Sequence, residues 1–254
     1  MRKLKKIILV AVVGLLVLAV IAVIVVGLSL GTIVRTGVNT VGPKLTQTTL
    51  TVDGVDVSLL SGSAKVKNLV IGNPQGYIAP NAISVGLAAV SVVPMSVLSD
   101  KIVIKSIRVE SPDITFEGNP LGANNLKKLE DNVNAAASSL QSTATTQPAK
   151  TGAPAKPAKK LEVDDFLITG AKIHYGTGLK LPLPDIHLTD LGKGPDGITP
   201  VELTKDVLSR VIAGTLKVVE NAAVNVGKET TKAVGENVGK VTTGLGGLFK
   251  KSTN

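Results

Sequence analysis

The longest apolar run of the chain lies at its N-terminus. Ile7 to Val34 contains no charged residue and follows a basic cluster that ends at Lys6. A helix needs about 20 apolar residues to cross the hydrocarbon core of a bilayer, and in lipid a single span has to satisfy its own backbone hydrogen bonds. The pattern therefore predicts a transmembrane anchor from about Ile7 to about Leu30, with lipid-facing residues that include Ile7, Leu15, Leu18, Ile21 and Ile24.

The flanking charges predict the orientation of this anchor. Arg2, Lys3, Lys5 and Lys6 precede the run and the single Arg35 follows it, which places the N-terminus in the cytoplasm and the rest of the chain outside it. A cleaved signal peptide is one alternative, but its apolar region is typically only about 7–15 residues long, and residues 31–34 are a poor cleavage site. A buried helix of a soluble domain is the other alternative.

A short apolar pattern recurs after the anchor. Apolar residues alternate, skip one extra position and alternate again, in five copies: Leu50, Val52, Val55, Val57; Ala64, Val66, Leu69, Ile71; Ile102, Ile104, Ile107, Val109; Leu161, Val163, Phe166, Ile168; and Leu181, Leu183, Ile186, Leu188. The third and fourth copies also match in their extensions, 111–116 and 170–175. Apolar-rich strands match so short a pattern easily, so chance is the alternative to a true repeat.

The skipped position predicts how these strands are built. Alternation has the period of a strand, and one extra residue reverses the facing, as a β-bulge does when it bends the strand. We therefore predict a bent antiparallel sheet, or groove, made of bulged strand repeats. Between the copies, Ile83, Val85, Leu87, Ala89 and Val93 alternate strictly and predict a strand that is apolar on both faces.

Helical patterns follow the strands. Asn124 to about Ser138 predicts a short helix, and residues 139–160 have the composition of a flexible linker. Thr199-Pro200-Val201-Glu202 is a capping box, after which Leu208, Ile212 and Leu216 belong to an apolar helical stripe. The expected class is mainly β with added helices (α+β). Its domains are an anchor at 1–35, a β-groove at 36–197 and an amphipathic helix with a weakly ordered tail at 198–254.

Composition narrows the possible functions. The chain has no cysteine, which excludes thiol nucleophiles, thiolate metal sites and disulfides. Its net charge of +9 comes largely from the anchor flanks, the linker and the C-terminus, and aromatic residues make up 2%, so base-stacking platforms for nucleic acid are missing.

Catalytic motifs are also missing from the sequence. We find no phosphate loop or serine elbow, and neither His174 nor His187 has a partner at a recognised metal-ligand spacing. We therefore expect no enzyme, no cofactor, no metal and no nucleic-acid partner.

The order of several motifs is similar to one known family. Gly42-Pro43-Lys44-Leu45 comes first, Ile71-Gly72-Asn73-Pro74-Gln75-Gly76-Tyr77 follows, and Ser96-Val97-Leu98 and Asn124-Asn125-Leu126 come later. After a single N-terminal span, this series resembles the AsmA-like envelope proteins over about Met1 to Tyr175. The resemblance implies an elongated β-groove related to chorein-type bridge-like lipid-transfer proteins. It also implies a single-pass inner-membrane protein whose main domain lies in the periplasm.

The chain departs from the larger relatives in length. With strands about 4.8 Å apart, some ten strands give a sheet only about 45 Å long, which is short for a complete bridge. The predicted function is binding of lipid acyl chains, with phospholipids as the expected source, and the resemblance implies a role in envelope lipid transport or outer-membrane homeostasis. The predicted groove lining is Val85, Leu87, Ile102, Ile104, Ile107, Val109 and Ile114.

A non-enzymatic scaffold is the alternative function. In that reading the same sheet binds partner proteins of the envelope, and the C-terminal helix is the expected site for such a partner. The discriminator is whether one face of the sheet forms an open apolar groove.

Overall fold

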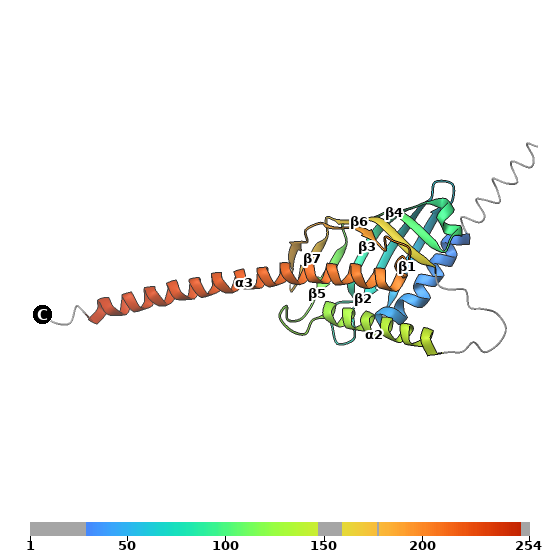
Figure 1. Ribbon diagram of the computed structural model, residues 1–254. Helices are drawn as coiled ribbons and strands as arrows, with labels where there is room; N and C mark the ends of the chain where they lie inside the picture. Colours follow the sequence, from blue (N-terminus) through green and yellow to red (C-terminus); the bar gives the residue numbers. More distant parts are fainter. Residues whose placement is uncertain (1–28, 147–158, 177, 250–254) are drawn as a thin grey trace, which may run out of the picture.

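The computed structural model describes residues 29–146, 159–176 and 178–249. This part of the chain is mixed α+β, with one nine-stranded sheet and helices on one side of it (Figure 1). The strands are β1 (Leu50–Ser58), β2 (Ser63–Gly72), β3 (Asn81–Val92), β4 (Lys101–Glu110), β5 (Asp113–Phe116), β6 (Lys160–Thr169), β7 (Lys172–Tyr175), β8 (Leu179–Pro182) and β9 (Ile186–Leu191).

Several short strands occupy the same position in the sheet as a second strand, one following the other end to end. β3 pairs with β2 on one side and with both β4 and β5 on the other. Next to them, β6 pairs with β4 and β7 with β5. At the far edge, β9 pairs with β6 and β8 with β7. The turn from β4 to β5 and the turn from β6 to β7 lie at the same level of the sheet. Ser111 and Gly170, one in each turn, both have positive φ, and the Ser111 N–H donates to the Thr169 carbonyl at 2.8 Å. The matched extensions of the third and fourth repeats are thus β5 and β7.

The prediction of an antiparallel sheet is wrong for two of these pairs. β4 pairs with β6 and β5 with β7 in parallel. A parallel pair needs a crossover connection of a dozen or more residues, and residues 117–159 supply it. The pairing follows the repeat: Ile104 lies opposite Val163 and Ile107 opposite Phe166.

The predicted two-against-one bulges inside the repeats are also not found. The register runs unbroken through the mid-pattern position of β1 with β2 and of β4 with β6. Both strands of each pair carry the extra residue at the same level. Their apolar side chains therefore switch faces of the sheet together, and the pairing register is kept. Register shifts do occur in β3, opposite Ile71 and Gly72 and again at Ser91 and Val92.

β3 contains a sixth copy of the pattern. Val85 lies opposite Leu69, and Ala88 lies opposite Val66, so the facing of β3 changes between Val85 and Ala88. Leu87 is opposite Glu110 and is exposed. The predicted continuous alternation through Leu87 is therefore wrong.

Three α-helices in the described residues accompany the sheet: residues 29–46, α2 (Asn125–Thr146) and α3 (Pro200–Phe249). The Asn124 side chain caps α2 by accepting from the Lys127 N–H at 2.9 Å. α2 runs further than the predicted Ser138, to Thr146. Helix extension beyond the Ala135–Ala137 run costs little, because each added residue gains a backbone hydrogen bond.

α3 begins with the predicted capping box. The Thr199 N–H donates to the Glu202 carboxylate at 2.8 Å, and the Glu202 N–H donates to the Thr199 hydroxyl oxygen at 3.1 Å. The hydrogen bonds from the backbone and hydroxyl of Thr199 lower the pKa of Glu202. From this end α3 runs beneath the sheet and continues past it (Figure 1).

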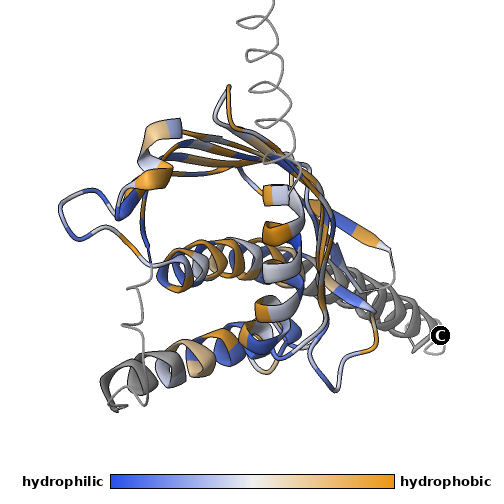
Figure 2. Cartoon of the chain, turned by 90° about the vertical axis from the view of Figure 1, so that its right-hand side faces the viewer, coloured by the Kyte–Doolittle hydropathy of each residue, from blue (hydrophilic) through white to orange (hydrophobic). Residues whose placement is uncertain are grey.

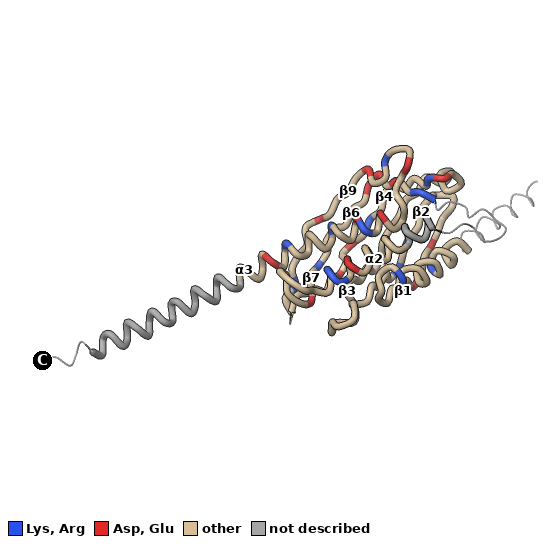
Figure 3. The backbone as a smooth tube through the Cα atoms, turned by 60° about the horizontal axis from the view of Figure 1, so that its bottom comes forward, with Lys and Arg blue, Asp and Glu red and all other residues tan. Residues whose placement is uncertain are grey.

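The sheet is curved, and α2 and α3 lie on its concave side, whereas the first helix hydrogen-bonds the backbone of edge strand β1 through Arg35 and Asn39. In Figure 2 the strands form an arch, with α3 under the arch and α2 below α3. The predicted apolar stripe of α3 packs into the same core as the strands, with Ile212 and Val219 almost fully buried. β4 carries mostly basic residues and its neighbour β6 mostly acidic ones, so opposite charges lie on adjacent strands (Figure 3).

Candidate functional site

The repeat positions turn to the concave face of the sheet. Ile104, Val163, Phe166, Ile168 and Leu188 are buried in the core. Most other positions of the second to fifth copies lie in or against this core, whereas those of the copy in β1 do not. Since each strand changes facing at the same level, apolar side chains line this face from β2 to β9. The concave face is therefore a continuous apolar surface.

The predicted open groove is instead covered by the chain's own helices. Leu126, Leu129 and Val133 of α2 and Leu208 and Ile212 of α3 are buried in the same core as the strands. About 25 cal/mol is gained per Å² of apolar surface removed from water, which favours this cover over an open face. The amphipathic α3 buries apolar surface that the short sheet would otherwise expose to water.

The cover is incomplete and leaves a cavity of about 290 Å³ between the sheet and the two helices. The strands contribute apolar lining residues, namely Leu69, Ile71, Ile83, Val85, Val109, Ile114, Phe166 and Ile168. The helices contribute Leu129, Val133, Leu203, Val207, Leu208 and Val211, with the exposed Thr204 at the rim. Such apolar walls offer a water no hydrogen-bond partners, which disfavours water inside the cavity.

The predicted lining residues fall into three groups. Val85, Val109 and Ile114 line the cavity. Ile102, Ile104 and Ile107 lie on the same face and pack in or against the core, but not at the cavity. Leu87 points to the convex side and is 40% exposed, so its predicted place in the lining is wrong.

Most of the helical lining was not predicted as part of the site. The sequence predicted an apolar stripe on α3 but did not indicate that Leu203 and Val207 border a cavity. The apolar spacing that continues upstream of Leu208 was the one signal that could have found them.

A buried amide network closes one end of the sheet. Asn125, which is fully buried, donates to Asn73 Oδ1 at 2.8 Å and to the Thr115 carbonyl at 2.7 Å, and accepts from the Glu117 N–H at 2.9 Å. Glu117 in turn accepts from the N–H groups of Ile78 and Ala79 at 2.8 and 2.6 Å. The motifs 71–77 and 124–126 thus fix the β2–β3 loop to the start of α2.

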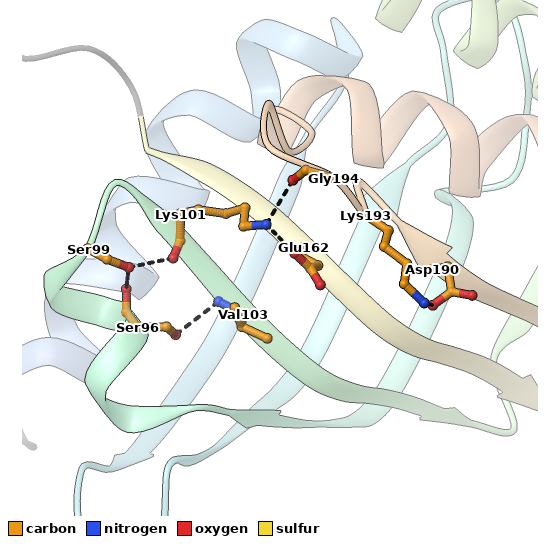
Figure 4. Close-up of polar contacts among 8 residues, drawn as sticks. All are labelled: Ser96, Ser99, Lys101, Val103, Glu162, Asp190, Lys193 and Gly194. Atoms are coloured by element: carbon orange, nitrogen blue, oxygen red, sulfur yellow. Dashed lines mark hydrogen bonds and ion pairs between the residues drawn. The ribbon is translucent and has the colours of Figure 1, made fainter.

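A second polar cluster fixes the start of α3 at the other end (Figure 4). Lys101 of β4 forms an ion pair with Glu162 of β6 and donates to the Gly194 carbonyl at 2.8 Å. The Ser96 hydroxyl of the 3-10 helix η1 (Pro94–Leu98) accepts from the Val103 N–H at 2.9 Å. These contacts hold η1 and the loop before α3 against the sheet.

Both histidine side chains are exposed, and each hydrogen-bonds an aspartate carboxylate. His174 Nε2 is 2.9 Å from Asp113 Oδ1, and His187 Nε2 is 2.5 Å from Asp165 Oδ1. Hydrogen bonds from His187 and Arg108 lower the pKa of Asp165. Within the described ranges no group of three or more potential ligands comes together for a metal ion.

The predicted anchor, except for its last residues from 29 onward, lies outside the part of the chain that the structure describes. Its residues Ile7, Leu15, Leu18, Ile21 and Ile24 all fall within 1–28. Among residues 29–146, 159–176 and 178–249, no helix has both the length and the hydropathy of a membrane span.

Comparison with known proteins agrees with the motif order. No curated protein and no solved structure matches the chain. The model of the AsmA family matches residues 1–180, a stretch that includes the strands from β1 to β7, the amide network and α2. The chain therefore belongs to the AsmA family.

Proposed function

We propose that this chain binds a lipid acyl chain in the cavity between the curved sheet and helices α2 and α3. Membership of the AsmA family is consistent with an envelope-associated function. Our proposal adds a single-pass inner-membrane anchor, a periplasmic main domain, and a role in envelope lipid transport or outer-membrane homeostasis.

The observation that carries the proposal is the apolar wall of the cavity. Its volume of about 290 Å³ lies at the lower end of typical ligand sites, about 300–1,000 Å³. An acyl segment gains about 0.8 kcal/mol for each methylene that it buries. The affinity for an acyl chain therefore grows with each methylene that the cavity encloses.

The lining includes one exposed polar residue. Thr204 lies in the first turns of α3 beside Leu203, whereas Thr46, at the end of the first helix, lines the cavity but is buried. A polar headgroup at exposed Thr204 would stay in water while the acyl chain lies inside.

Filling the cavity tests the proposal. Val207→Phe adds a ring at a half-buried lining position, so we expect lipid that co-purifies with the detergent-solubilised full chain to fall several-fold in mass spectrometry of the extract. Val224→Phe makes the same change at an exposed position of α3 and should retain wild-type lipid. Equal lipid in both variants, or none in the wild type, would contradict the proposal and favour the scaffold.

A further inference from the structure

Exposed apolar side chains gather at one end of the molecule. Of the twelve large apolar residues that are exposed in the described ranges, six belong to three segments that meet there. We call this set the apolar tip: Ile33, Val34, Leu60, Met95, Val97 and Leu98.

Contacts show that the three segments adjoin. The first helix runs antiparallel to β1, because a Cβ on Gly31 would lie 2.1 Å from the Val55 carbonyl oxygen and Arg35 Nε donates to the Val52 carbonyl at 3.1 Å. Residue 29 therefore lies beside the end of β1, next to the turn that carries Leu60.

The third segment, η1, lies against that same turn. The Val92 N–H donates to the Gly62 carbonyl at 2.6 Å, and a Cβ on Gly62 would lie 2.9 Å from Pro94 Cγ. Figure 1 shows the start of the first helix and η1 at the same end.

We propose that the apolar tip docks into the surface of the bilayer that holds residues 1–28. The inference rests on the proposed anchor: the N-terminal segment outside the described part is 28 residues long, is apolar from Ile7, and joins the described part at residue 29. A bilayer around that segment meets the tip first. Clustered exposed apolar side chains mark an interaction site, and such side chains bury about 5–10 Å into the headgroup boundary.

Charge plays a minor part in this docking. Lys159, which donates to the Val97 carbonyl, and Asp100, two residues beyond Leu98, bring opposite charges to the tip. The apolar side chains therefore carry the contact, and vesicles need no excess of anionic lipid.

The opposite end of the sheet offers a matched control. Ile78 and Leu121 are 96% and 78% exposed, similar to Leu60 at 83% and Leu98 at 81%. They flank the amide network of Asn73, Glu117 and Asn125, to which Ile78 donates through its N–H. A docked tip leaves this end in water.

The test uses single-cysteine variants of the full chain, which has no cysteine of its own. Leu60→Cys, Leu98→Cys, Ile78→Cys and Leu121→Cys each receive an environment-sensitive fluorophore. The labelled chains are reconstituted in phosphatidylethanolamine–phosphatidylglycerol vesicles with or without spin-labelled acyl chains. A probe at Leu18→Cys reports whether the anchor is inserted.

We expect the probes at positions 60 and 98 to be blue-shifted and quenched several-fold more than those at 78 and 121. Equal quenching at all four positions means that the domain lies flat, and no quenching at 60 and 98 means that the tip stays in water; each result overturns the inference. If the probe at position 18 is quenched while those at 60 and 98 are not, only the docking of the apolar tip is wrong. If the probe at position 18 is also unquenched, the proposed anchor is wrong as well.

Discussion

Buried side-chain amides define the irregular end of this sheet at the scale of single residues. Asn125 connects the β2–β3 loop, the end of β5 and the start of α2 through three hydrogen bonds. Sequence reasoning found Asn73 and Asn125 as motif members without a role for them. Their partners lie up to 52 positions apart, a distance that local pattern does not reach.

Removal of the Asn125 amide tests this role. Asn125→Ala leaves the Glu117 N–H and Asn73 Oδ1 without their partner inside the protein, and such a loss costs about 1–3 kcal/mol. We expect the unfolding midpoint in urea, followed by circular dichroism of the full chain in detergent, to fall accordingly. Asn221→Ala, at an exposed position of α3, should stay within about 0.5 kcal/mol of wild type. A wild-type midpoint for Asn125→Ala would contradict the structural role of the network.

At the scale of elements, the repeat was predictable and the strand directions were not. Four of the five copies each lie within one strand, β1, β2, β4 or β6, and the copies in β4 and β6 lie side by side in the register that the pattern gives. The fifth copy is instead divided between β8 and β9, so its prediction as one strand is wrong. The pattern alone fits parallel and antiparallel neighbours equally well, so the parallel pair could not be foreseen. The sixth copy, in β3, was hidden because Leu87 and Ala89 continue an apolar alternation across the change of facing.

Docking of α3 is the element-scale feature that a substitution can probe. Ile212 is 1% exposed, and Ile212→Asp would bury a carboxylate without a partner, which is strongly destabilising. We expect α3 to detach and trypsin to cleave after Arg210 and Lys217 much faster than in wild type. Val224→Asp, at a half-exposed position of the same helix, should leave the digestion pattern unchanged. Slow, wild-type cleavage of Ile212→Asp would contradict docking.

At the scale of the whole molecule, the chain forms a curved sheet whose concave face is covered by two helices of the same chain. The sequence predicted an apolar concave face but left open whether that face is a groove or a closed core. The structure has features of both, since α2 and α3 bury most of the face and leave a cavity of about 290 Å³. The partner predicted for the C-terminal helix stays a prediction.

Orientation follows from the same arrangement. The first helix and η1 lie at the tip, and α3 starts near this end, where Ile198 bridges to Leu161, and runs away from it past the sheet (Figure 1). If the tip faces a bilayer, the far end of α3 points away from that bilayer. The cavity then lies between the membrane end and the projecting helix, where an acyl chain could be held outside the bilayer.

Photocrosslinking in intact cells tests the central claim, that the cavity holds lipid, most directly. Val85 lines the cavity and Leu87, two residues further along β3, faces outward. We predict that a small aliphatic diazirine residue at position 85 forms an acyl-chain adduct detectable by mass spectrometry of the purified chain, whereas the same residue at position 87 does not. No adduct at position 85, or equal adducts at both positions, would contradict the account.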